Sequence, residues 1–434
     1  MGTPANPGDY LGRVLHVLEI IAPTRLGVGF RWLLASSWTS NLGDGIAIAA
    51  GPLLVASQTD DPLLVALAAL VQWLPPLLFG LLAGAVADRL NRRLIVVTVD
   101  LARTVVLVVL CLTIATDAIS IALVLGCLFL ISTAEVFADN TSSTLLPMLV
   151  HRDELAIGNA RLTTGFITVN QLAGPPLGAA LFAVGMVWPF VAQAILVSLG
   201  ALLVSRIALP PHGRDREQRA RLRQDIGDGL CWAWRNPAVR TLMLTIFMFN
   251  ITFGAAWSVL VLYATQRLGM GEIGFGLLTT VSAVGGLLGT AAYGWITRRI
   301  SLGNIMRIGL IVETLTHLAL ALTTSPWVAL AIFFVFGAHA FIWGTTSITV
   351  RQRAVPTAVQ GRVGSVNLVA VFGGLVIGSG IGGVTAREWG VTAPFWFAFV
   401  GSAVFVVVIW RQLVHIAHDD AQPADSRGAP DDHR

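Results

Sequence analysis

The chain has 434 residues, of which 55% are apolar and only 12% are charged, and its mean hydropathy is +0.76. Because a soluble globular chain carries about 25% charged residues, this composition excludes a water-soluble fold of the same length. The net charge is +4, and all the basic residues counted in it are arginines, because the sequence contains no lysine. A Walker A loop and a pyridoxal-phosphate enzyme each need a lysine, so both are excluded.

Twelve apolar runs follow one another along the chain, each long enough to cross about 30 Å of hydrocarbon as a helix. They cover residues 31–57, 63–87, 94–116, 119–141, 162–184, 187–207, 238–264, 274–297, 305–323, 327–350, 364–386 and 392–410. None shows the alternation typical of barrel strands, so helices satisfy the backbone in lipid. We predict an all-α membrane protein with twelve transmembrane helices.

The arginines predict the orientation of these helices. With a cytoplasmic N-terminus, every arginine except Arg103, Arg267 and Arg387 lies in or beside a cytoplasmic segment. This is a strong positive-inside bias, and an even number of spans returns the C-terminus to the same side. Arginines scattered between apolar runs also argue against a nucleic-acid partner.

Polar interruptions divide the chain into two halves. The longest of them follows the sixth run, and Leu222, Ile226, Leu230 and Trp234 predict an interfacial amphipathic helix at its end. The predicted parts are a cytoplasmic N-terminal segment (1–30), a six-helix bundle (31–207), a cytoplasmic linker (208–237), a second six-helix bundle (238–411) and a disordered cytoplasmic tail (412–434).

The two halves repeat each other's landmarks. The fifth run has Asn170, Gly174 and Gly178 at a spacing of four residues. The eleventh run repeats this spacing with Gly374, Gly378 and Gly382. Gly84–Arg89 after the second run is matched by Gly294–Arg299 after the eighth. Because six spans separate the halves, equivalent helices run in the same direction, as in a parallel repeat about the membrane normal.

The turn after the second run carries a motif with a glycine, an aspartate and three arginines. The motif reads Gly84-x-x-x-Asp88-Arg89-x-Asn91-Arg92-Arg93. It resembles the loop 2–3 motif of the major facilitator superfamily, with Asn91 in place of a second glycine. The resemblance covers about residues 31–411 and implies two pseudo-symmetric six-helix halves that rock about a midplane site. The fourth span lacks the arginine that drug–proton antiporters of the superfamily often carry.

Two further stretches resemble exporters of the superfamily. Gly174, Pro175 and Gly178 belong to a run similar to the fifth-helix motif of exporters, and we expect a close-packed seam there that seals the outer side. Looser cues in the linker and at Gly361-Arg362 resemble the branch containing siderophore and macrolide exporters. The resemblance implies a multi-pass protein of the bacterial inner membrane, with both termini in the cytoplasm.

By the same resemblance, the loop 2–3 motif latches the two halves together on the cytoplasmic side. Asp88 is expected to cap the N-terminal end of span eleven, and Gly84 to let that helix approach. Arg92 is expected to pair with Asp139, or with Glu135 one turn deeper. Solvated charges that only set the topology would explain the arginines equally well, but not Gly84.

Two sites inside the spans carry charge. Asp44 lies near the middle of span one, where a carboxylate costs about 3 kcal/mol, so a proton or cation site competes with a helix-packing role. Glu135 is the second candidate for proton coupling. Asp100 and Arg103 are three residues apart in span three and are expected to form an intramembrane ion pair, as are Glu313 and His317 in span nine.

Polar and aromatic side chains in the spans suit a cavity for an amphipathic or aromatic ligand. The candidates are Asn41, Asn250, Trp257, His339 and Trp343, for each of which simple packing is the alternative. We predict a proton-coupled exporter of small amphipathic compounds that is not an enzyme. It is expected to be a monomer in contact with lipid, to use protons and to need no metal or cofactor. The alternatives are a nutrient importer of the same fold and a non-transporting scaffold.

Overall fold

The structure is a computed structural model that describes residue 19 and residues 21–209, 222–356 and 359–413. Within these ranges the chain forms helices and connecting turns and no strand. Most of the predicted N-terminal segment, the charged start of the linker and almost all of the predicted tail lie outside the described residues. The all-α membrane fold predicted from the sequence is confirmed.

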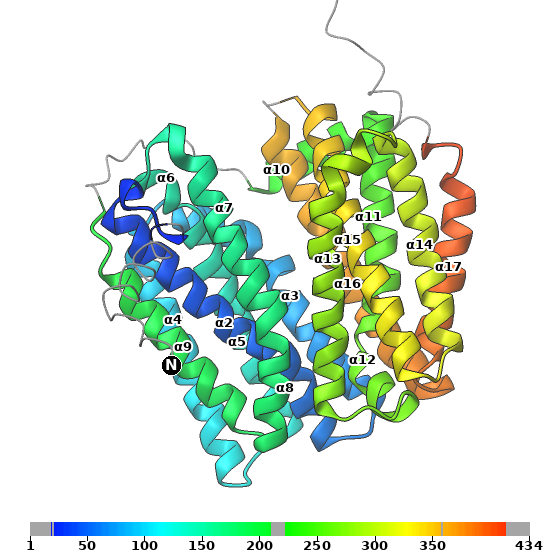
Figure 1. The fold of residues 1–434 in the computed structure, drawn as a ribbon, viewed down its shortest axis with the longest axis horizontal. Coiled ribbons are helices and arrows are strands. Elements are labelled where there is room, and N and C mark those ends of the chain that lie inside the picture. The colour runs from blue at the N-terminus through cyan, green and yellow to red at the C-terminus, as the bar shows by residue number, and fades with distance from the viewer. Residues whose placement is uncertain (1–18, 20, 210–221, 357–358, 414–434) are drawn as a thin grey trace, which may run out of the picture.

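Each of the twelve predicted runs coincides with one helix or with consecutive helices (Figure 1). The first half contains α2 (Gly27–Gln58), α3 (Pro62–Ala87), α4 (Arg92–Ala115), α5 (Ile121–Ser143), α7 (Leu155–Gly165) continued by the π-helix η3 (Phe166–Ala173) and α8 (Gly174–Val184), and α9 (Trp188–Ser205). The second half contains α11 (Pro237–Trp257) with α12 (Leu260–Leu262), α13 (Glu272–Thr297), α14 (Leu302–Leu322), α15 (Pro326–Ala354), α16 (Gln360–Trp389) and α17 (Ala393–Ile409).

The remaining elements are short or lie beside the spans. They are η1 (Thr24–Leu26), α6 (Leu146–Leu149), η2 (Arg152–Glu154), α10 (Leu222–Arg235) and the π-helix η4 (Tyr263–Arg267). Among the described residues, ten helical segments are long and apolar enough to cross a membrane. The ten do not include α17, which has 17 residues, or α2, whose apolar character is interrupted by Asp44 and a run of serine, threonine and asparagine. The twelve-span count therefore stays a prediction for these two helices.

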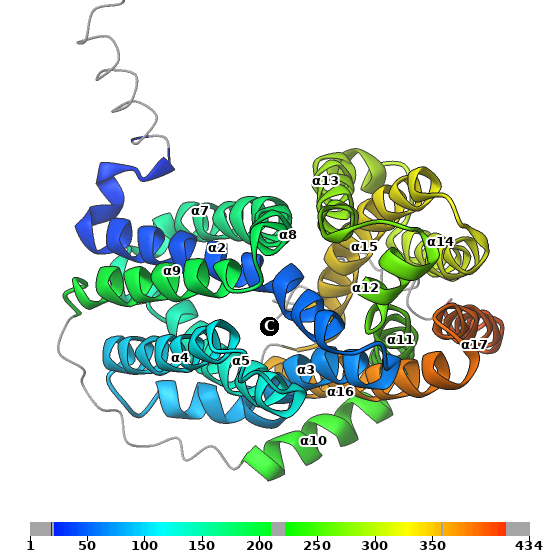
Figure 2. The ribbon, with the colours of Figure 1, turned by 90° about the horizontal axis from the view of Figure 1, so that it is seen from below.

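The two halves touch at one end of the molecule and diverge at the other (Figure 1). Helix α3 packs against α16 from the joined end, where Asp61 lies 3.7 Å from Arg387, to the middle of both helices, where the ring centroids of Trp73 and Phe372 are 6.2 Å apart. Figure 2 shows α3 and α16 side by side between the halves. The diverging end carries α6, α7 and α10, which the arginine bias assigns to the cytoplasm, so the conformation is open on the predicted cytoplasmic side.

Glycines allow equivalent helix pairs in the two halves to pack at backbone contact. A Cβ added at Gly174 would lie 2.5 Å from the Cα of Gly45 in α2, and one at Gly178 would meet the carbonyl of Ile46. In the second half, Gly378 meets the carbonyl of Ile251 in α11 in the same way. These contacts pack α8 on α2 and α16 on α11, which places Gly45, the neighbour of Asp44, at a backbone contact between two helices. That this seam seals the outer side stays a prediction.

The helix that carries Pro175 and Pro176 changes from α-helical to π-helical hydrogen bonding just before these prolines. Residues Phe166–Ala173 are π-helical, and α8 begins at Gly174 with the prolines in its first turn. Since proline has no backbone N–H and its ring clashes with the preceding turn, the i to i−4 ladder is interrupted here.

The amphipathic helix predicted at the end of the linker is α10. Leu230 and Trp234 are 53% and 58% exposed, whereas Ala233 is buried against the second half. Gly229 lets the helix approach the backbone of Arg362 in α16. The side chains of Leu222 and Ile226 lie outside the described residues. An outward apolar strip beside arginine is typical of a helix at a membrane surface.

The orientation can be tested with single cysteines. Asp60 and Glu388 are exposed at the joined end, and native Cys231 is exposed on α10 at the diverging end. With the other native cysteines replaced, residue 60 or 388 as cysteine should react with an impermeant maleimide in intact cells, and Cys231 only after permeabilisation. Arg216, a second linker position suited to this test, lies outside the described residues. Labelling of Cys231 from outside would overturn the orientation.

Candidate functional site

The first half holds a cluster of three carboxylates around one arginine, here called the acid–arginine cluster (Asp44, Asp100, Arg103 and Glu135). Arg103 Nη2 bonds Asp44 Oδ1 and lies 3.9 Å from Glu135 Oε2, and Nη1 lies 3.5 Å from Asp100 Oδ1. The Arg103 side chain is 1% exposed. The spacing of Asp100 and Arg103 brings those two together, but the sequence contained no signal that Asp44 and Glu135 share the same guanidinium.

Three helices position the cluster. Asp44 comes from α2, Asp100 and Arg103 from α4, and Glu135 from α5. Next to Arg103, Thr104 Oγ1 lies 3.0 Å from Ser198 Oγ, which ties α4 to α9. On the other side of the cluster, Gly45 allows α2 to pack directly against the backbone of Asn170.

The charges of the cluster do not balance. One guanidinium faces three carboxylates, and Arg103 Nε has no hydrogen-bond partner within the described residues. Uncompensated charge inside a low-dielectric interior is costly, so a site with excess carboxylates stabilises either bound protons or a bound cation. The arrangement can therefore exchange a proton for a cationic group.

Access to the cluster is uneven. The Asp44 side chain is 8% exposed and that of Asp100 is 3% exposed, whereas that of Glu135 is 37% exposed and Asp139, one turn further along α5, is also exposed. An ionised carboxylate facing lipid would be strongly unfavourable, so we assign this exposure to the space between the diverging halves. Glu135 is then the member of the cluster that meets water from the predicted cytoplasmic side.

The loop 2–3 motif does not make the contacts expected of a closed latch. Arg92 lies 3.3 Å from Asp88 Oδ1 and donates to the carbonyl of Thr144, and it forms no ion pair with Asp139 or Glu135. The expected Arg92–Asp139 pair is therefore absent from this conformation. Arg93 donates to the carbonyl of Ile207, at 2.9 Å, and Arg89 is exposed.

The expected partners of Asp88 and Gly84 are also absent here. The Asp88 side chain is 73% exposed, so it does not cap α16, and a Cβ at Gly84 would meet nothing within 4 Å. The physical reason is the separation of the halves at this end, which leaves Asp88 exposed and no other helix close to Gly84.

The candidate cavity residues fall into separate groups. Asn41 and Asn250 donate to backbone carbonyls of their own helices, at 2.8 and 2.7 Å, and neither contacts Asp44 through a hydrogen bond. Trp257 belongs to an aromatic cluster, with ring centroids 4.3 Å from Phe253 and 4.7 Å from Phe336.

The other two cavity candidates lie together on α15. His339 Nε2 lies 3.1 Å from Glu313 Oε2 on α14. Trp343 Nε1 is buried without a hydrogen-bond partner among the described residues. The spacing along α14 predicts a pair of Glu313 with His317, but His339 is the nearer partner, and that contact could not be predicted from spacing because it joins two helices.

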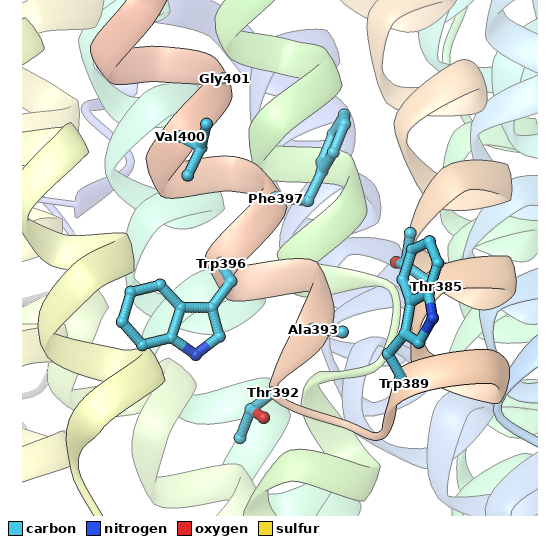
Figure 3. A pocket seen from close by; sticks show the side chains of 8 residues that line it. All are labelled: Thr385, Trp389, Thr392, Ala393, Trp396, Phe397, Val400 and Gly401. Carbon is cyan, nitrogen blue, oxygen red and sulfur yellow. The ribbon is translucent and has the colours of Figure 1, made fainter.

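A pocket of about 680 Å³ lies apart from these groups, between the ends of α16 and α17 (Figure 3). Its walls include Trp389 and Trp396, whose rings stand on opposite sides of the turn that joins the two helices. None of the candidate site residues lines it.

Comparisons with known proteins agree with this architecture. The sequence model of the family described as transmembrane secretion effector matches residues 19–431. The multidrug efflux pump Tap of Mycolicibacterium fortuitum is 28% identical over 369 residues, which cover 80% of this chain and 85% of Tap. The uncharacterised transporter YkuC of Bacillus subtilis is 24% identical over 326 residues, covering 70% of this chain and 72% of its own.

Solved transporter structures have the same fold. A bacterial homologue of the iron transporter ferroportin, in its inward-facing state, superposes with a TM-score of 0.72 at 15% identity and covers 91% of this chain and 99% of its own. The nucleoside transporter NupG gives a TM-score of 0.68 at 14% identity, covering 90% and 99%. The chain is therefore a multi-pass membrane transporter that belongs to the transmembrane secretion effector family of the major facilitator superfamily.

Proposed function

We propose that this transporter exports small amphipathic organic compounds by alternating access and is driven by protons that enter from outside. The observation that carries the proposal is the acid–arginine cluster, in which three carboxylates share Arg103 near the middle of the first half. Support also comes from the relative Tap, which is named a multidrug efflux pump.

The proton step follows from the charge imbalance. With the cytoplasmic side open, Glu135 meets water and is the group that releases a proton, while Asp44 stays paired with Arg103. A site with excess negative charge then favours a cationic group of the substrate. After the halves rock, a proton from outside neutralises Asp44, weakens its bond to Arg103 and displaces the cation.

The apolar part of the substrate has a matching surface in the second half. Phe253 and Trp257, which are partly exposed, stack on each other, and both pack on the buried ring of Phe336. Aromatic faces also attract cations through their π-systems. In this proposal the charged group of an amphipathic cation binds at the acid–arginine cluster and its apolar part binds at the aromatic cluster. The loop 2–3 motif and the glycine seams would close the two ends in turn.

The direction of transport is tested in everted membrane vesicles that contain the full chain, with ethidium as the probe. An acid interior should drive ethidium into everted vesicles, and a protonophore should release it. Vesicles without the chain are the control. Accumulation in right-side-out vesicles would instead identify an importer. A lack of movement across a panel of cationic, neutral and anionic amphiphiles, including a macrolide and a siderophore, would overturn the transport proposal.

A further inference from the structure

The second half holds a buried group of titratable side chains that the proposed proton step does not use. This Glu–His cluster consists of Glu313 and His317 on α14 and His339 on α15. Glu313 Oε2 lies 3.1 Å from His339 Nε2, and Oε1 lies 3.9 Å from His317 Nε2. The side chains are 14%, 0% and 8% exposed, respectively, so the cluster lies inside the protein near the middle of both helices.

His317 is fully buried and yet lacks a hydrogen-bond partner. Neither Nδ1 nor Nε2 is bonded to any of the described residues. A buried polar atom without a partner costs free energy and is rare in native structures, so each case calls for a functional explanation. Glu313 Oε1 lies 3.9 Å from His317 Nε2, and a shift of less than about 1 Å would bring the two atoms within hydrogen-bond distance.

No other charged group reaches this depth in the described helices around the cluster. From α11 the neighbours are Phe253 and Trp257, whose ring lies edge-on to His317 at 6.1 Å. Helix α17, which packs on α14, has no titratable residue, and α13, which packs on α15, has only Glu272 in its first turn and Tyr293 near its cytoplasmic end. From η4, Tyr263 Oη donates to the carbonyl of Leu320, one turn from His317, and Arg267 donates to carbonyls at the end of α14. Within the described residues neither forms a hydrogen bond or ion pair with the side chains of the cluster, whose three members face one another.

The internal repeat relates this cluster to the acid–arginine cluster with the charges inverted. Helices α4 and α14 are the third helices of their halves, and Arg103 and Glu313 each stand eleven residues after the first residue. In the first half a central cation is surrounded by carboxylates. In the second half a central carboxylate is surrounded by imidazoles.

We propose that Glu313, His317 and His339 form a second proton-binding site, at which the Glu313 carboxylate bridges α14 and α15. With one proton in the cluster, an imidazolium at His339 pairs with ionised Glu313 and the cluster is neutral. A second proton from water binds His317 Nε2, which then donates to Glu313 Oε1. The Glu313 carboxylate is then shared between His317 on α14 and His339 on α15. The strength of the contact between α14 and α15 therefore changes with the number of protons bound. Each half of the transporter then carries a proton site, an inference that extends the proposed proton coupling.

The site is tested by ¹⁵N-histidine nuclear magnetic resonance of the full chain in lipid bilayers, with the proton as the probe. The eight histidines are assigned by single changes to glutamine. Between pH 9 and pH 4, His317 should change from the neutral to the imidazolium pattern, and the His339 signal should shift with it. In Glu313→Gln the proton affinity of His317 should fall by about 10- to 1,000-fold, since an ionised partner at this distance is removed.

Controls separate this inference from general damage and from the proposed function. His151→Gln, which removes an exposed imidazole outside the cluster, should leave the His317 titration unchanged. Glu313→Asp keeps the charge and should give an intermediate affinity if Glu313→Gln fails to fold. A His317 that stays neutral down to pH 4, or that titrates equally in Glu313→Gln, would refute the site. Failure of the wild type to move any amphiphile would refute the proposed export but leave this titration intact.

Discussion

Asp44→Asn is expected to abolish proton-driven accumulation of ethidium in everted vesicles while leaving its downhill exchange intact. Asparagine has the shape of a protonated aspartate but cannot lose the proton, so the bond to Arg103 no longer depends on the proton gradient. A gradient can shift a conformational equilibrium only through a group whose protonation differs between the two states. The measurement is ethidium uptake with and without an imposed pH difference.

The fold should tolerate this change because Arg103 keeps two other acids. Asp100 Oδ1 and Glu135 Oε2 remain 3.5 and 3.9 Å away, so the buried guanidinium is not left without a counter-charge. Removing one partner of a buried ion pair typically lowers the free energy of unfolding by about 3–5 kcal/mol, because the other charge is left unpaired. We expect this cost when Arg103 is replaced, but not when Asp44 is replaced. Loss of coupling in Asp44→Asn can therefore be separated from loss of folded protein.

Asp100→Asn is the matched control. It makes the same chemical change to a carboxylate that contacts the same arginine, but its side chain is 3% exposed and it sits on the same helix as Arg103. We expect it to retain its response to the gradient, and Asp44→Glu to retain part of it with a shifted pH optimum. A full response in Asp44→Asn would move the coupling role to Glu135, which Glu135→Gln then tests.

The sequence was sufficient for the helices and for contacts within one helix. Run lengths predicted the twelve helical segments, and a spacing of three predicted that Asp100 and Arg103 meet, because both depend only on local geometry. The convergence of Asp44, Arg103 and Glu135 depends on how α2, α4 and α5 pack, which no spacing along the chain encodes. The contact of Glu313 with His339 was missed for the same reason.

The expected latch contacts are absent from this conformation for a different reason. The motif that contains Gly84, Asp88 and Arg92 can be read from the sequence, but we expect its partners to reach it only when the ends of the halves on the predicted cytoplasmic side meet, so the latch stays a prediction. In the open conformation Asp88 and Arg92 pair with each other instead. A sequence specifies both conformations of a transporter, whereas one structure displays the contacts of one of them.

Asp88→Asn is expected to lose transport while the protein still reaches the membrane at normal levels. In this open conformation the side chain is 73% exposed, so the change removes no buried contact. In the closed conformation a carboxylate at the start of α16 would gain up to about 2 kcal/mol from the helix dipole, and its loss would shift the population roughly 30-fold toward the open form. A single cysteine at exposed Gln360 in the first turn of α16 should then label faster with maleimide.

Gly84→Leu tests the same closure of the two halves by adding a bulky side chain instead of removing a charge. A Cβ at Gly84 meets nothing within 4 Å here, so leucine should fit the open conformation and obstruct only the approach of another helix. Gly126→Leu is the matched control, because Gly126 is exposed on α5 and also has nothing within 4 Å. We expect Gly126→Leu to transport normally and Gly84→Leu to be blocked with Gln360→Cys readily labelled. Normal export by both Asp88→Asn and Gly84→Leu would mean that the cytoplasmic side closes without this motif.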